Sequence, residues 1–256
     1  MLRNIILTLL VLVSTASYGF VVYGGNPYQE YDVRNSWEKA VVYVPGNFLT
    51  KSVDNITVSN PMPVVLFLHG CGGINEQERK WANFLKSQKF IVVLLDSYAI
   101  PNREKNCISA TNTTNIGKVP VNDLRPAEAE YAISKLKDMP WADSNNIFLM
   151  GHSEGGMGAF LTKELGLQGV IISGFPCTIR GRRFGSSKDT PTLILNHERD
   201  PFFIRPGVEY AQCSDRPYWK FRTNSTEVIL SGNGHGTADA PIAQEAVSNF
   251  LKENKK

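Results

Sequence analysis

The chain has 256 residues, of which 42% are hydrophobic and 20% are charged, and its formal net charge is +3. This length is sufficient for one large domain with a substantial core, and the apolar content excludes a chain that is disordered throughout. Apart from the charged tail at positions 252–256 there is no dense basic block, so we expect no nucleic-acid partner.

Residues 1–19 have the three parts of a signal peptide. Arg3 makes the start positive, residues 5–13 form an apolar run, and residues 14–17 are small enough for cleavage near position 17 or 19. We expect this segment to be removed and residues 20–256 to form one exported domain, periplasmic or secreted, with no stable membrane insertion after cleavage. A buried first strand and an uncleaved anchor are the alternatives.

Short apolar runs then alternate with longer amphipathic segments. The runs are apolar almost throughout, which predicts strands buried on both faces, at residues 63–68, 90–95, 147–150, 169–172, 192–195 and 227–230. The amphipathic segments predict helices at about residues 76–88, 123–137, 154–165 and 241–252. Residues 39–44 and 56–59 are candidates for antiparallel edge strands. This alternation predicts an α/β fold with a central, mostly parallel sheet.

The strand at 147–150 leads into Gly151-His-Ser-Glu-Gly-Gly156, a G-x-S-x-G pattern between a predicted strand and a predicted helix. A nucleophile on such a turn needs strained backbone angles, and because strand and helix pass close together, Gly151 and Gly155 must lack side chains. The turn presents the Ser153 hydroxyl beside the free N–H groups of the helix N-terminus. We predict that Ser153 is a nucleophile.

A serine nucleophile needs a base, and after this motif the chain order is serine, acid, histidine. The chain has four histidines. His69 precedes the serine, His152 adjoins it on the turn, and His197 comes before any convincing acid. His235 follows the last strand on a glycine-rich loop, so we predict that it is the base; the alternative is a solvated loop histidine.

The acid that orients the histidine is expected just past the strand at 192–195. Asp200 lies there and is followed by Pro201, which ends the turn. Glu198 is the nearest alternative, and Asp239 comes too soon after His235. We predict that Asp200 holds the His235 tautomer and stabilises the imidazolium.

A tetrahedral intermediate also needs two N–H donors for its oxyanion. One is predicted to be the amide of Glu154, and the other an amide of His69-Gly-Cys-Gly-Gly73, which follows the strand at 63–68. The sequence leaves open whether Cys71 or Gly72 supplies it. The alternative reading of this segment is an ordinary glycine turn.

With these motifs the sequence resembles the α/β-hydrolase superfamily and, within it, the exported dienelactone hydrolase-like proteins. The resemblance covers about residues 37–252, and its remaining motifs are Asp96-Ser-Tyr98 and Gly234-His-Gly236. It implies an α/β-hydrolase fold, with helices on both faces of the sheet, and hydrolysis of carboxylic esters without a cofactor. Dienelactone hydrolase has a cysteine where this chain has Ser153, which argues against a dienelactone substrate but leaves ester hydrolysis intact.

Four cysteines fit an exported protein, because disulfides persist in oxidising compartments. Spacing alone does not choose among their three pairings. The sheet order of the superfamily implies Cys71 with Cys107 and Cys177 with Cys213, since each pair would follow neighbouring strands. The sequence has no C-x-x-C or H-E-x-x-H motif and no phosphate-binding glycine loop, so we expect neither a metal nor a nucleotide cofactor.

Two other functions remain as alternatives: a serine peptidase or amidase of the same fold, and an exported binding module that is catalytically silent. Residues 174–191 are too short for a multi-helix lid and are basic, containing Arg180, Arg182, Arg183 and Lys188. We therefore expect an open site for a small-molecule substrate, namely small, soluble or mildly anionic esters or lactones. The polar stretch at 102–121 is a candidate rim of this site. The sequence makes no prediction of the oligomeric state.

Overall fold

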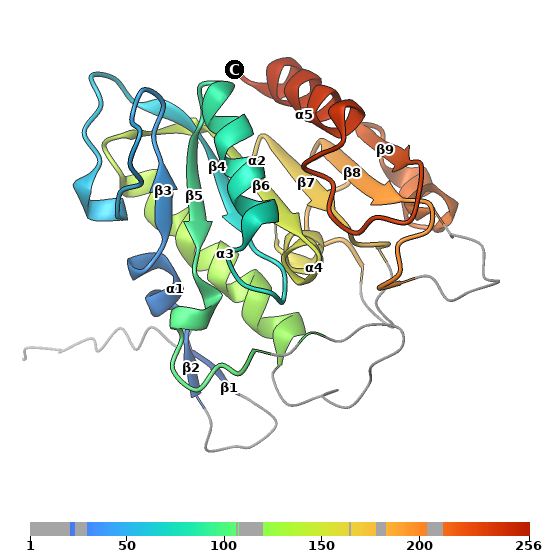
Figure 1. Ribbon diagram of the computed structural model, residues 1–256, viewed down its shortest axis with the longest axis horizontal. Helices are drawn as coiled ribbons and strands as arrows, with labels where there is room; N and C mark the ends of the chain where they lie inside the picture. Colours follow the sequence, from blue (N-terminus) through green and yellow to red (C-terminus); the bar gives the residue numbers. More distant parts are fainter. Residues whose placement is uncertain are drawn as a thin grey trace, which may run out of the picture.

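The computed structural model (Figure 1) describes residues 21–23, 30–105, 107, 120–163, 165–177, 183–203 and 212–256. The expected signal peptide and most of the polar stretch at 102–121 lie outside these residues, as do Arg180 and Arg182. No helix in the described part of the chain is long and apolar enough to cross a membrane. The extent of the domain, residues 20–256, stays a prediction.

A seven-stranded sheet runs through the molecule in the order β3-β5-β4-β6-β7-β8-β9 (Figure 1). Strand β3 pairs antiparallel with β5 at one edge, and all other neighbours are parallel. The inner strands are aliphatic and buried on both faces, as a covered parallel sheet requires. The strands are β3 (Val41–Tyr43), β4 (Met62–Leu68), β5 (Ile91–Leu95), β6 (Ala142–His152), β7 (Gly169–Ser173), β8 (Thr192–His197) and β9 (Ser225–Leu230), while β1 (Val21–Tyr23) and β2 (Glu30–Asp32) form a separate antiparallel pair.

Helices cover both faces of the sheet. Side chains along β4 alternate between two cores: Leu66 and Leu68 pack in the core that α1, α3 and α4 cover, and Phe67 packs in the core under α2 and α5. The α-helices are α1 (Arg34–Glu38), α2 (Glu76–Ser87), α3 (Val121–Asp138), α4 (Glu154–Leu161) and α5 (Pro241–Asn254), and the short 3-10 helices are η1 (Val53–Asn55), η2 (Ser97–Ala99), η3 (Cys213–Asp215) and η4 (Trp219–Phe221). The predicted α/β architecture is therefore confirmed.

One predicted strand is wrong. Residues 56–59 form no strand; Ile56 and Val58 instead pack half-buried against the core, and the outer edge of β3 makes a single bridge, from Val42 to Lys51. The helix expected to reach residue 165 ends at Leu161, because the chain at Gly185 crosses its end and donates from Gly185 N to Phe160 O. Strand β6 starts five residues earlier than expected, in a mostly polar stretch of which Ser144 and Asn145 are exposed.

Both implied disulfides are present. Cys71 is bonded to Cys107, and Cys177 is bonded to Cys213. Each bridge lies beyond the carboxyl ends of two adjacent strands, β4 and β5 for the first, β7 and β8 for the second. These ends form the edge of the sheet at which open α/β proteins bind their ligands.

Candidate active site

The turn between β6 and α4 holds Ser153 in a strained conformation, with φ 58° and ψ −118°. A side-chain-bearing residue keeps a positive φ only where its surroundings hold it, and here Ser153 N donates to Ser173 O at 2.8 Å. A Cβ atom on Gly151 would lie 2.0 Å from Gly155 O, and one on Gly155 would lie 2.0 Å from Leu68 O. The two glycines therefore permit the close approach of strand and helix that the motif predicts.

The three residues predicted as nucleophile, base and acid come together beside this turn. His235 Nε2 lies 2.8 Å from Ser153 Oγ, and His235 Nδ1 lies 2.6 Å from Asp200 Oδ2. Asp200 is buried, and its Oδ1 accepts a hydrogen bond from Phe202 N. Because an ionised carboxylate only accepts, the Nδ1 of the imidazole carries the proton and Nε2 is left to accept the serine proton. Such an arrangement can activate a serine hydroxyl.

Aromatic rings surround the imidazole of His235. Phe202 stacks on it with ring centroids 4.2 Å apart, Phe203 lies at 5.7 Å, and His152 lies at 4.9 Å. The His152 side chain points toward β7, where its Nδ1 lies 3.0 Å from Ser173 Oγ. Burial, with a smaller contribution from His235, lowers the pKa of His152 to about 3, so this side chain stays neutral beside His235.

The alternative acids and the remaining histidine, His197, are engaged elsewhere. Glu198 accepts from Gly232 N and pairs with Arg199 at 3.4 Å. Asp239 forms an ion pair with Lys80 at 2.8 Å. The ring nitrogens of His197 lie within hydrogen-bonding distance of the backbone carbonyls of residues 231 and 236. Among the residues named from the sequence, Asp200 is thus the carboxylate that contacts His235.

Residues 69–73 contain the predicted oxyanion donors Cys71 and Gly72; this segment, which we call the oxyanion loop, lies directly against Ser153. A Cβ atom on Gly70 would lie 3.1 Å from the Cβ of Ser153. Gly73 N donates to Gly70 O and closes a tight turn, so Cys71 and Gly72 occupy its centre. Glu154 is the first residue of α4, so its amide has no partner within the helix. The two predicted donor segments therefore both adjoin Ser153.

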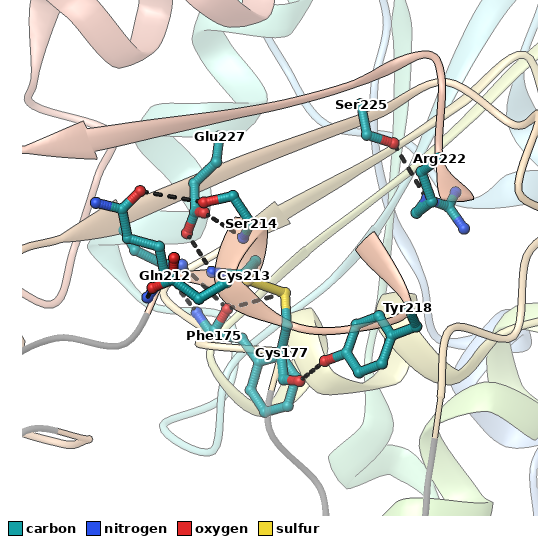
Figure 2. The surroundings of a disulfide bond; sticks show 11 residues. Phe175, Cys177, Gln212, Cys213, Ser214, Tyr218, Arg222, Ser225 and Glu227 are labelled. Carbon is teal, nitrogen blue, oxygen red and sulfur yellow. Dashed lines mark hydrogen bonds between the residues drawn. A yellow bond between two sulfur atoms is a disulfide. The ribbon is translucent and has the colours of Figure 1, made fainter. Parts of the chain in front are cut away.

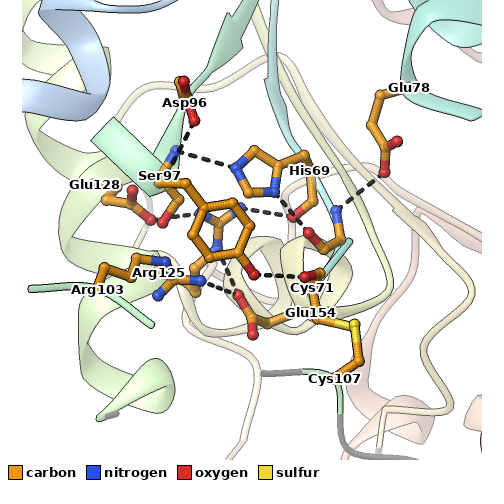
Figure 3. A network of polar contacts seen from close by, with 12 residues as sticks. His69, Cys71, Glu78, Asp96, Ser97, Arg103, Cys107, Arg125, Glu128 and Glu154 are labelled. Atoms are coloured by element: carbon orange, nitrogen blue, oxygen red, sulfur yellow. Dashed lines mark hydrogen bonds and ion pairs between the residues drawn. A yellow bond between two sulfur atoms is a disulfide. The ribbon is translucent and has the colours of Figure 1, made fainter. Parts of the chain in front are cut away.

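Several contacts hold the oxyanion loop from behind (Figure 3). Ser97 N donates to His69 Nε2 at 3.0 Å, and Glu78, which also caps α2, accepts from Gly70 N at 3.1 Å. The Tyr98 hydroxyl donates to Cys71 O. Burial raises the pKa of Glu78. Burial, with a smaller effect of the Arg125 charge, also holds the pKa of His69 well below its usual range. His69 is consequently a neutral structural ring and not a second base.

Sequence reasoning missed a cluster of buried charges next to this loop (Figure 3). Arg103 donates to Glu154 Oε1 at 2.5 Å, and Arg125 donates to Glu128 Oε2 at 2.7 Å. The side chains of Arg125 and Glu128 are fully buried, although the pattern of α3 predicts a charged outer face. The sequence carries no signal for their burial, because an oppositely charged pair three residues apart is typical of an exposed helix face.

The second disulfide joins the segment after β7 to the chain between β8 and β9 (Figure 2). Glu227 on β9 accepts from the backbone N–H groups of Cys213 and Ser214, both at 3.0 Å, and the Tyr218 hydroxyl donates to Cys177 O. These contacts join the chain after β8 to β9 and to the segment after β7. Of the basic residues between 174 and 191, Arg183 is exposed and Lys188 pairs with the adjacent Asp189 at 3.8 Å.

Within the described residues, no group of three or more His, Cys, Asp or Glu side chains is arranged to hold a metal ion.

Comparison with solved structures places the chain in the α/β-hydrolase fold. It is similar to a Klebsiella pneumoniae protein assigned as a dienelactone hydrolase, at 15% identity and a TM-score of 0.55 over 77% of this chain and 86% of that one. A dienelactone hydrolase-like promiscuous phosphotriesterase from metagenomic libraries shares 17% identity, with a TM-score of 0.55 over 78% and 89% of the two chains. An esterase of Pyrococcus furiosus shares 15% identity, with a TM-score of 0.54 over 77% and 85%. No family model and no curated protein matches the chain.

Proposed function

We propose that this protein is an exported serine hydrolase that cleaves carboxylic esters through an acyl-enzyme intermediate. The observation that carries the proposal is the hydrogen-bonded chain from Ser153 Oγ through the His235 imidazole to Asp200, on a strained turn at the start of α4. The fold shared with an esterase and a dienelactone hydrolase-like phosphotriesterase supports hydrolysis as the reaction class. The two disulfides and the expected signal peptide support export.

In the proposed reaction the Ser153 hydroxyl attacks the ester carbonyl carbon while its proton passes to His235 Nε2. The carbonyl oxygen becomes an oxyanion, which the amides of Glu154 and of Cys71 or Gly72 stabilise. The intermediate then collapses, the C–O bond to the alcohol breaks, and the alcohol leaves with the proton from His235. Water repeats the sequence on the acyl-serine and regenerates the enzyme, with Asp200 stabilising the imidazolium each time.

The proposed substrates are small, soluble esters or lactones. The chain between β7 and β8 is too short for a multi-helix lid, which supports an open site. A series of p-nitrophenyl esters with increasing acyl length tests this part: short acyl chains should be preferred, and a steep preference for long, interfacial substrates would contradict it.

The function itself is tested with p-nitrophenyl acetate and a matched peptide amide. The wild-type protein should hydrolyse the ester, and Ser153→Ala should lower kcat by about a thousandfold or more, since members of such a triad act as a unit. Faster cleavage of the amide would favour a peptidase, and absence of turnover on both would favour a silent binding module. Retention of near-normal ester hydrolysis in Ser153→Ala would refute the assignment.

A further inference from the structure

We propose that Arg125 is a positioning residue that holds the two oxyanion donor segments, the oxyanion loop and the N-terminus of α4, at a fixed separation. The proposal rests on the proposed function, because the two segments have a common task only if an oxyanion forms between them. Arg125 does not face the reacting atoms; it acts through the backbone of His69 and the side chain of Glu154 (Figure 3).

The guanidinium of Arg125 contacts both segments at once. Its Nη2 donates to His69 O at 2.8 Å, immediately before the turn that contains the amides of Cys71 and Gly72. Its Nε lies 3.6 Å from Glu154 Oε1, an ion-pair distance to the residue that carries the other proposed donor. One rigid cation therefore links the end of β4 to the start of α4 behind the nucleophile.

The position of Arg125 is itself strictly defined. Its side chain is fully buried, and Nη1 donates to Glu128 Oε2, one turn further along α3, at 2.7 Å. A Cβ atom on Gly158 of α4 would lie 2.8 Å from the Arg125 Cβ, so the two helices touch at this point. Two nitrogens of one planar group donate hydrogen bonds to separate partners, and the third lies at ion-pair distance from Glu154, an arrangement that the single ammonium of lysine does not reproduce.

The charges around Arg125 balance. Two arginines, Arg103 and Arg125, face two carboxylates, Glu128 and Glu154, with little exposure to solvent. Removing one member of a buried cluster leaves an uncompensated charge, whereas removing an opposite pair keeps the balance. A variant that loses Arg125 together with the charge of Glu128 therefore separates the positioning role from the cost of an unpaired buried charge.

A change in the distance between two oxyanion donors affects the transition state more than the bound ester, because the oxygen acquires its full negative charge only during the reaction. Displacement of a reacting group by about 1 Å lowers the rate by up to about 100-fold. We therefore expect Arg125→Met to lower kcat by about 10- to 100-fold, with little change in KM.

The test compares a carboxylic ester with the matched thionoester, in which sulfur replaces the carbonyl oxygen and accepts N–H hydrogen bonds poorly. The wild-type protein should prefer the oxygen substrate. Arg125→Met, and the double variant Arg125→Met with Glu128→Gln, should lose much of this preference, because the two donor segments are no longer held at a fixed separation. Both variants leave the triad intact. Rates are expressed per active site titrated with a fluorophosphonate, so a smaller folded fraction does not alter the ratio.

Arg222→Met is the matched control. Arg222 is also a buried arginine, which donates to Thr190 O at 3.0 Å and Thr192 Oγ1 at 2.8 Å, beside the start of β8. Asp200 follows the opposite end of this strand, so Arg222→Met should reduce stability but leave the oxygen-to-sulfur ratio unchanged.

The outcomes are distinguishable. A lower ratio in both Arg125 variants and an unchanged ratio in the control support the positioning role. An unchanged ratio in the double variant, with ester turnover retained, overturns that role and leaves the proposed function standing. A wild-type protein that turns over neither substrate contradicts the proposed function and the positioning role with it.

Discussion

Each of the two disulfides closes a loop between cysteines that are 36 residues apart, yet only one of them is attached to the oxyanion loop. In the chain-entropy model, opening a loop of this length costs about 4 kcal/mol of stability, and the cost is the same for both bridges. The double variant Cys71→Ala with Cys107→Ala and the double variant Cys177→Ala with Cys213→Ala should therefore be destabilised to a similar extent. Their effects on catalysis should differ.

The difference follows from what each bridge holds. Cys71 occupies the centre of the oxyanion turn, and its bond to Cys107 ties that turn to the chain beyond β5. Without the bond, three hydrogen bonds to this segment remain: from the Tyr98 hydroxyl to Cys71 O, from Gly70 N to Glu78, and from Arg125 to His69 O. We therefore expect the turn to become more mobile but to keep its position. We expect kcat to fall by about tenfold in the first variant, within the range for small displacements of catalytic groups, and to stay nearly constant in the second.

Urea unfolding followed by far-UV circular dichroism gives the two stabilities, and ester hydrolysis per titrated site gives the two values of kcat. Equal losses of kcat in the two variants would refute the reasoning about the oxyanion turn. Stabilities that differ by more than about 2 kcal/mol would show that native-state contacts, and not loop length, dominate the effect of the bridges.

Two further predictions concern the turn that carries Ser153. Gly155→Ala places a Cβ atom 2.0 Å from Leu68 O. We expect overpacking to lower the free energy of unfolding by about 1–3 kcal/mol and to abolish ester hydrolysis. A variant with normal stability and activity would be inconsistent with this packing. His152, whose pKa burial lowers to about 3, stays neutral in the folded state, while the unfolded chain takes up a proton below about pH 6.5. As the pH falls between these values, the free energy of unfolding should therefore decrease by about 1.4 kcal/mol per pH unit. Urea unfolding measured at pH 7 and pH 5 gives this pH dependence, and His152→Gln should remove the contribution. The same pH dependence in His152→Gln and in the wild-type protein would contradict the prediction.

The fold was predictable because its signals are local and consistent. Aliphatic runs bounded by turn residues predict the parallel strands, and the spacing of Gly151 and Gly155 around Ser153 predicts the strained turn. The acid and the base follow from the order of the motifs along the chain. The edge strand expected at residues 56–59 failed because an apolar pair such as Ile56 and Val58 packs equally well as irregular chain against a core.

The support of the oxyanion loop was not predictable in the same way. The spacing of Arg125 and Glu128 predicts an exposed ion pair on the surface of a helix. The pair is buried because α4 packs closely against this side of α3, which the sequence does not reveal. Arg103 lies in a polar stretch without periodicity, and its pairing with Glu154 depends on the path of that stretch. Long-range polar contacts of this kind depend on tertiary structure, whereas strands and turns depend mainly on neighbouring residues.

Mass spectrometry of the protein after treatment with a fluorophosphonate tests most directly whether Ser153 is a nucleophile activated by His235. We predict one adduct per chain, located on Ser153 and accompanied by loss of ester hydrolysis, with much slower labelling in His235→Gln. Ser173, buried in the adjacent strand, serves as the internal control and should stay unmodified. An adduct on another serine, or ester hydrolysis that persists in the fully labelled protein, would contradict this account.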